Sequence, residues 1–238
     1  MKHNQWISIS DMMAGIMMIF LLIMVSFMLI TQKTQEDLKI QNQKLLELNE
    51  AMSEIAQNYS NLQQELYEAL LKEFEKDLKK WDAHIDEDNT IRFNEPEVLF
   101  DTGAKQVKKR FQDILDDFFP RYVKILSLPK FQDSIEEIRI EGHTSQSWFS
   151  AQTLEERYLG NAELSQARAL EVLKYCFNLK KIDSHKEWLI KVFRANGLSF
   201  AKPLEDDDKS RRVEFRVITK ANKDLLRILE ISKDFEPK

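Results

Sequence analysis

The sequence contains few residues that form turns, disulfides or cysteine metal sites. Cys176 is the only cysteine among 238 residues, which excludes an internal disulfide and a zinc site built on cysteine pairs. Glycine and proline occur five times each, and neither occurs between Gly15 and Pro96. Because these residues are the usual helix breakers, their absence favours a long continuous helix in the first part of the chain.

The chain also lacks an excess of positive charge. Its 35 basic and 40 acidic residues give a net charge of -5. A general nucleic-acid-binding protein would need a concentrated basic face, so no nucleic-acid contact is expected. The sequence has no phosphate-binding loop, nucleophile elbow or pair of catalytic carboxylates, and its 4 histidines lack metal-ligand spacing. We therefore predict neither an enzyme nor a metal or cofactor site. The acidic run at residues 205–208 is interpreted as a solvated loop, with a cation site as the alternative.

Charged residues are missing altogether from Met12 to Gln32, where most side chains are those of Met, Ile, Leu, Phe or Val. A helix of about 20 apolar residues crosses a bilayer. The run is longer than the apolar region of a signal peptide, about 7 to 15 residues, and no small-x-small cleavage site follows it. We therefore expect an uncleaved single-pass membrane anchor over residues 1–32. The basic residues on its two sides do not fix its orientation.

Asp11 lies at the head of this apolar run. Counted from Trp6, it is about five residues, or roughly 7 Å, inside the helix. An ionisable side chain at that depth is costly to bury and usually faces a partner or a water path. Asp11 is therefore the leading functional candidate. The alternative is that it only marks the membrane interface.

After Lys33 the chain becomes polar, with apolar residues at alternating spacings of three and four. This a/d pattern is typical of a left-handed coiled coil and continues for about three and a half heptads. The residues are Leu45, Leu48, Met52, Ile55, Tyr59, Leu62, Leu66 and Ala69. The apolar positions of the repeat then shift by one residue. They continue as Leu70, Phe74, Leu78 and Trp81. We predict a coiled-coil linker over residues 33–85 that pairs two copies, with an amphipathic helix lying on its own domain as the alternative.

Residues 86–238 contain shorter elements. Apolar and polar alternation predicts strands at 90–93, 135–141, 198–201 and 212–219. Helical periodicity predicts helices at 104–126, 161–179, 185–195 and 221–232. Pro120 is expected to interrupt or kink the first of these helices, and Asn161 to cap the second. Strands and helices that alternate in this way indicate an α+β or α/β sandwich.

Three motifs then occur in order, after an entry sequence LFDTG at Leu99–Gly103. They are IRIEGHT at Ile138–Thr144, NAELSQARA at Asn161–Ala169 and SRRVE at Ser210–Glu214. Together they resemble the C-terminal domain shared by OmpA-like and MotB-like proteins, over about residues 90–220. The resemblance implies an α+β OmpA-like sandwich in the periplasm that binds the peptide stem of peptidoglycan. It also implies a cytoplasmic N-terminus and a location in the bacterial inner membrane.

The diaminopimelate of such a stem presents carboxylates and an ammonium, which a forked guanidinium, helix amides and an acidic side chain can bind. On the matching motif positions, Arg168 would supply the guanidinium, Asn161 hydrogen bonds at the helix start, and Arg212 a second cation. The peptidoglycan-binding residues implied by the resemblance are Thr144, Ser145, Asn161, Leu164, Arg168 and Arg212.

One position departs from the family pattern. Where the family has Thr-Asp, this chain has Thr144-Ser145, so the carboxylate that would meet the ammonium is missing. Glu141, Glu155 and Glu156 are the alternatives that sequence alone offers for it. The departure puts the strength of wall binding in question.

The N-terminus carries a second resemblance. Trp6, followed by the run DMMAGIMMIF from Asp11, is similar to the ion-carrying helix of MotB-type stator subunits. With the Gly-His-Thr-Ser sequence and the predicted coiled coil, the chain most resembles the MotB-like subunit of the Zorya anti-phage defence system. The resemblance implies that Asp11 carries the ion. It also implies a homodimer inside a ring of about five copies of a larger MotA-like membrane subunit.

Protons are favoured over sodium as the ion. Met and Ile surround Asp11, and only Ser8 and Ser10 offer nearby side-chain oxygens, whereas sodium prefers several oxygen ligands. Two alternatives stay open. One is a flagellar motility stator, which is a close relative. The other is a passive peptidoglycan tether in which Asp11 has no ionic role.

Overall fold

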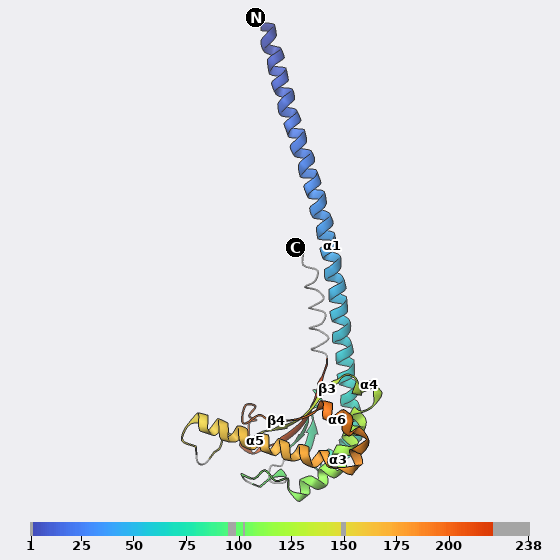
Figure 1. The fold of residues 1–238 in the computed structure, drawn as a ribbon, viewed down its shortest axis with the longest axis vertical. Coiled ribbons are helices and arrows are strands. Elements are labelled where there is room, and N and C mark those ends of the chain that lie inside the picture. The colour runs from blue at the N-terminus through green and yellow to red at the C-terminus, as the bar shows by residue number, and fades with distance from the viewer. Residues whose placement is uncertain (1, 95–98, 102, 149–150, 221–238) are drawn as a thin grey trace. The chain divides into compact units, whose positions relative to one another are not determined.

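The computed structural model describes residues 2–94, 99–101, 103–148 and 151–220 (Figure 1). The helix predicted at 221–232 lies outside these residues. The chain divides into two compact units between Glu54 and Ile55, and each is considered by itself.

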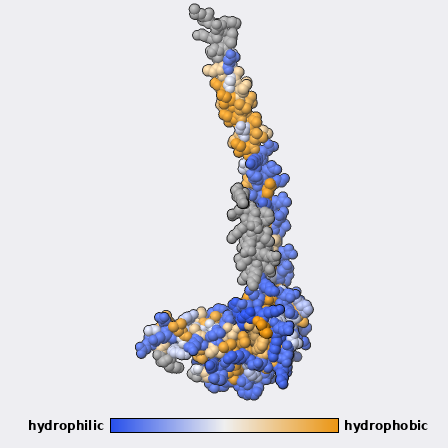
Figure 2. Space-filling model, in the orientation of Figure 1, coloured by the Kyte–Doolittle hydropathy of each residue, from blue (hydrophilic) through white to orange (hydrophobic). Residues whose placement is uncertain are grey.

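The N-terminal unit is formed by the first part of α1, which spans Lys2–Leu78. From Met12 to Ile30 its large apolar side chains are exposed, and Figure 2 shows them as a hydrophobic band. Ser10–Leu78 contains a stretch that is long and apolar enough to cross a membrane. An apolar surface of this size is normally covered by lipid or by another protein. The predicted membrane anchor therefore has the required helix.

The second unit is built on a mixed sheet, and in the described residues its strand order is β1-β2-β5-β3-β4. β3 and β4 are parallel, and the other neighbouring strands are antiparallel. The strands are β1 Ala83–Ile85, β2 Ile91–Phe93, β3 Ile135–Gly142, β4 Phe193–Gly197 and β5 Val213–Thr219. β2, β3 and β5 confirm the predicted strands. The helix predicted at 185–195 ends at Val192, so its last three residues belong to β4, and the strand predicted at 198–201 is a turn.

Short and long helices connect and cover these strands (Figure 1). They are α3 Lys109–Leu126, α4 Pro129–Gln132, α5 Leu154–Phe177, α6 Lys186–Val192 and α7 Asp207–Ser210, with a 3-10 helix at Lys180–His185 before α6. The core joins α3 to the sheet through aromatic side chains. The ring centres of Phe118 and Phe215 are 5.0 Å apart, and those of Phe118 and Phe93 are 5.3 Å apart.

The predicted helix at 104–126 is corrected in two places. α3 begins at Lys109, because Lys108 before it has an extended backbone, with φ of -66° and ψ of 151°. α3 also continues through Pro120 rather than stopping there. Proline cannot donate to the carbonyl four residues earlier, and Lys181 Nζ reaches that Asp116 carbonyl at 3.4 Å instead.

The last part of α1 belongs to this domain. Leu66, Leu70 and Phe74 are buried in its core, and Arg121 of α3 forms ion pairs with Glu73 at 2.7 Å and Asp77 at 2.9 Å. The alternative of a helix lying on its own domain therefore holds for this part of α1. The apolar residues that remain for pairing two copies are Leu45, Leu48, Met52, Ile55 and Tyr59, which are exposed or half-buried.

Candidate functional site

The three sequence motifs meet where β3 ends. The His143 N–H donates to the Arg212 carbonyl at 3.0 Å, which joins the first motif to the third. A Cβ atom at Gly142 would lie 2.3 Å from the Ser165 carbonyl oxygen, so only glycine allows α5 to pack this closely on β3. The first motif thereby also contacts the second.

Ser199 lies in the turn that covers this junction, and no sequence pattern singled it out. Its φ of 52° lies in the left-handed region that disfavours side chains larger than glycine. Three hydrogen bonds hold it there. Its N–H donates to Ser165 Oγ at 3.0 Å, its Oγ donates to the Tyr158 carbonyl at 3.1 Å, and its carbonyl accepts from the Thr144 N–H at 3.0 Å.

α5 begins earlier than predicted, so the expected role of Asn161 as its cap is wrong. Thr153 caps the helix, because its Oγ1 accepts from the Glu156 N–H at 3.1 Å while the Glu156 carboxylate accepts from the Thr153 N–H at 3.3 Å. This Thr-x-x-Glu capping box was present in the sequence as a signal. Asn161 is buried within α5, and its Nδ2 donates to the Arg157 carbonyl at 3.0 Å.

Arg168 is a buried cation that holds the LFDTG segment against α5. Its side chain lies over the ring of Phe100, with 4.9 Å from Cζ to the ring centre. Its Nε donates to the Ala104 carbonyl at 2.9 Å and its Nη2 to the Asp101 carbonyl at 3.2 Å. Burial, and then the charge of Arg211, lower the pKa of Arg168 to about 10. Arg168 is therefore still positive at neutral pH.

The other predicted binding residues lie in different environments. Leu164 is half-buried on α5, one turn before Arg168, and Thr144 and Ser145 are buried just after β3. Arg212 is buried and does not present a cation to solvent. Its Nε donates to Glu214 Oε1 at 2.6 Å, and its Nη1 donates to the Lys202 carbonyl at 3.2 Å.

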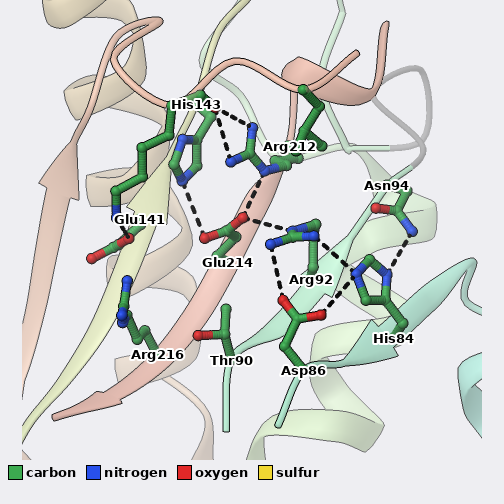
Figure 3. Close-up of polar contacts among 12 residues, drawn as sticks. His84, Asp86, Thr90, Arg92, Asn94, Glu141, His143, Arg212, Glu214 and Arg216 are labelled. Atoms are coloured by element: carbon green, nitrogen blue, oxygen red, sulfur yellow. Dashed lines mark hydrogen bonds and ion pairs between the residues drawn. The ribbon is translucent and has the colours of Figure 1, made fainter. Parts of the chain in front are cut away.

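Glu214 is the centre of the charged network in Figure 3. Its Oε1 accepts from Arg212 and from Arg92 Nε, the latter at 2.7 Å, and its Oε2 lies 3.3 Å from His143 Nε2. Burial raises the pKa of Glu214, but the interaction with His143, together with that with Arg212, outweighs it. They hold the pKa of this carboxyl well below its usual range.

Glu141, His143 and Glu214 also place three possible metal-ligand atoms within 4.8 Å of one another. Two guanidinium groups already bind Glu214, and Lys202 Nζ lies 3.7 Å from Glu141 Oε2. Because these cations balance the carboxylates, the group is a charge network of the fold rather than a place for a further cation.

The contacts of the fold also limit which carboxylate can replace the one that is missing at Ser145. Glu141 is buried beside Lys202, and the carboxylate of Glu156 belongs to the cap of α5. Two of the three alternatives that the sequence offered are therefore already engaged by the fold.

Asp11 lies in the other unit. Its side chain is exposed on α1, next to the apolar band. Gly15 follows one helical turn later on the same face, and open space surrounds the position that a Cβ there would take.

Comparisons with known proteins agree with this architecture. The OmpA family model matches residues 99–214. The chain is 40% identical to the Zorya protein ZorB of Escherichia coli strain Crooks over 235 residues, which cover 96% of this chain and 93% of that protein. It is 32% identical to the protein YtxE of Bacillus subtilis strain 168 over 138 residues, 56% of this chain and 49% of that protein.

Two solved structures are similar to parts of the chain at lower identity. A MotB-like protein from Desulfovibrio vulgaris is 22% identical, with a TM-score of 0.45 over 72% of this chain and 98% of that one. The cell wall anchor of the T6SS from Pseudomonas aeruginosa is 22% identical, with a TM-score of 0.44 over 63% of this chain and 96% of that one. From its identity to ZorB over nearly the whole length, the chain belongs to the ZorB family of Zorya proteins, with an OmpA-family domain at residues 99–214.

Proposed function

We propose that the chain is the wall-anchored stator subunit of a proton-driven Zorya complex in the bacterial inner membrane. The observation that carries the proposal is the position of Asp11. It is a carboxylate at the head of an exposed apolar helix, in a chain that is 40% identical to ZorB over 96% of its length. The function of such a complex is defence against phage.

In this proposal two copies pair through the apolar residues of α1 from Leu45 to Tyr59, which are exposed or half-buried in one copy. About five copies of a MotA-like membrane subunit surround the paired helices. The exposed side chains from Met12 to Ile30 give these subunits an apolar surface. Gly15, one turn from Asp11, has no side chain to hold a neighbouring helix away from the carboxylate.

Asp11 then alternates between carboxylate and neutral acid as protons pass down their gradient. Moving one charge through the membrane potential is worth about 2.3 kcal/mol per 100 mV. Because each protonation removes a negative charge that faces the partner ring, each transfer can bias one rotational step. Few oxygens lie near Asp11 to replace the water around sodium, which favours protons.

The OmpA-family domain lies in the periplasm and binds peptidoglycan through Arg168. Its guanidinium is fixed by two main-chain carbonyls, at 2.9 and 3.2 Å, and by the ring of Phe100. A cation whose position is fixed loses little conformational freedom when it binds a carboxylate of the peptide stem. The domain holds the complex to the wall, so that torque acts on the partner subunits.

The test is the replacement of Asp11 by Asn, with Asp11→Glu as the matched control. D11N removes the titrating group and keeps the size of the side chain. We expect it to reduce proton flux into vesicles containing the complex to background and to abolish protection against phage, with the complex still assembled. D11E retains an acid and is expected to keep part of the flux. If the chain is a passive tether, D11N protects as well as the unmodified chain.

A further inference from the structure

β4 is the last strand of the sheet in the described part of the chain, so one of its edges has no partner strand there. β3 pairs with the other edge in parallel register, from Ile138 with Phe193 to Gly142 with Gly197. The main-chain N–H and C=O groups of an unpaired edge can bond to a strand of another molecule, and native proteins usually block such edges. The groups that occupy the free edge of β4 therefore decide whether it is a contact surface.

The side chain of Gln166, on α5, takes the place of a strand at this edge. Its Nε2 donates to the Ala195 carbonyl at 3.1 Å, and its Oε1 accepts from the Gly197 N–H at 2.7 Å. A residue in a neighbouring parallel strand makes the same two bonds to residues two positions apart, one as donor and one as acceptor. Because these groups of β4 bond to α5, they face away from β3.

Gly197 allows α5 to lie close enough for this contact. A Cβ atom at Gly197 would lie 2.3 Å from the main-chain nitrogen of Gln166, so a larger residue would push α5 away. Gln166 is exposed, and Ala195 and Gly197 are half-buried. The amide of Gln166 therefore covers the edge at the surface of the domain rather than inside its core.

Arg194 occupies the next group along the same edge. Its Nη1 donates to the Phe193 carbonyl at 2.9 Å, and also to the Ile190 carbonyl at 3.1 Å in the last turn of α6. The main-chain groups of alternate residues face the same edge of a strand, so the carbonyls of Phe193 and Ala195 both face outward. Side chains thus occupy these two carbonyls and the outward N–H of Gly197.

The same groups would pair two copies of the strand. Suppose that β4 of one copy lies antiparallel to β4 of a second copy, with the two Ala195 residues opposite each other. The Gly197 N–H of each copy then donates to the Phe193 carbonyl of the other, and the two Ala195 residues exchange their N–H and C=O bonds. Such a contact is closed and twofold symmetric, as most homodimer contacts are. The edge of β4 is therefore self-complementary once its covering side chains are removed.

We propose that the free edge of β4 is a latent contact site for a second copy of this chain and that Gln166 keeps it closed. Two copies held in one membrane complex, as proposed above, have a high effective concentration, so even a weak edge would pair without this cover. Domains joined at β4 would be held at one place, whereas separate domains can each reach their own attachment point. The closed edge itself depends neither on proton flux nor on wall binding.

The test compares Gln166→Ala with Gln64→Ala as the matched control. Gln64 is an exposed glutamine whose side-chain bond, to Glu68 at 2.9 Å, stays within α1. The full chain is studied in detergent micelles by sedimentation and by hydrogen exchange at the Gly197 amide. Both are measured at a concentration where sedimentation shows single copies and at one about a hundredfold higher, where a weak contact would form. Thermal unfolding checks that each variant is folded.

In single copies, we expect the Gly197 amide of Q166A to exchange about tenfold faster than that of the unmodified chain, as loss of one hydrogen bond implies. At the higher concentration its exchange is expected to slow again, because a strand of the second copy then accepts from it. Q166A should also associate at about tenfold lower concentration than the unmodified chain, as the added strand contact implies. Q64A should match the unmodified chain in every measurement.

Two results would overturn the proposal. A Gly197 amide that stays protected in single copies of Q166A would show that Gln166 is not the cover of the edge. An amide that exchanges fast at both concentrations would show that the uncovered edge does not bind a second copy, even if Q166A associates, because its copies would then be joined elsewhere.

Discussion

At the scale of single residues, Glu214 links the stability of the domain to pH. Its pKa in the folded domain is depressed from an ordinary value of 4.5, so it contributes stability at any pH above that value. That stability is lost as the pH falls from about 4.5 through the depressed pKa. Urea unfolding at a series of pH values is expected to show this loss.

The variant Glu214→Gln tests the assignment. It leaves Arg212, Arg92 and His143 without their shared carboxylate and is expected to cost about 3 kcal/mol at neutral pH, as breaking a buried ion pair does. Its stability is also expected to fall less steeply below pH 4.5. Glu187→Gln, on the exposed side of α6, is the control and should match the unmodified domain. Equal acid sensitivity in E214Q and the unmodified domain would contradict the role of Glu214.

The sequence motifs drew attention to individual residues, but they did not predict the contacts that these residues make with distant segments. Arg168 was singled out from its motif, but its bonds to the Ala104 and Asp101 carbonyls depend on the folded turn and could not be predicted. Arg212 looked like a surface cation because alternation in a strand does not reveal its buried partner Glu214. Ser199 could not be predicted, because a serine with positive φ has no sequence signature.

At the scale of elements, α1 contributes apolar side chains to two different interfaces. One is the core of its own domain, and the other is the proposed contact between two copies. Its a/d pattern continues through Leu66, where the helix already lies on its own domain. Both surfaces require apolar residues at spacings of three and four, so the pattern alone cannot show where one ends and the other begins. The same limitation applies to the start of α5, where the capping box at Thr153 was the better signal than Asn161.

A pair of substitutions in α1 separates the two surfaces. Leu66→Ala removes a side chain that is 2% exposed in the domain core and is expected to lower the free energy of unfolding by about 2 to 5 kcal/mol. Leu48→Ala, in the part proposed to pair two copies, is expected to weaken the dimer and leave domain stability unchanged. Sedimentation and urea unfolding measure the two quantities. A dimer weakened by L66A but not by L48A would contradict this division of the helix.

At the scale of the whole molecule, the proposal assigns ion transfer and wall attachment to separate units of the chain. Asp11 lies in the unit that ends at Glu54, and Arg168 lies in the unit that begins at Ile55. If the two roles are independent, each can be lost without the other. D11N is expected to sediment with isolated cell walls as the unmodified chain does, although it carries no protons.

Arg168→Gln is expected to give the opposite result. It should leave the wall fraction, lose protection in cells, and still support normal proton flux in vesicles, where no wall is present to resist rotation. E205Q, an exposed change in the same domain, is the control for both measurements. A drop in vesicle flux for R168Q would mean that the domain acts on the membrane unit directly. Wall attachment would then be part of how the proton path opens rather than only a mechanical support.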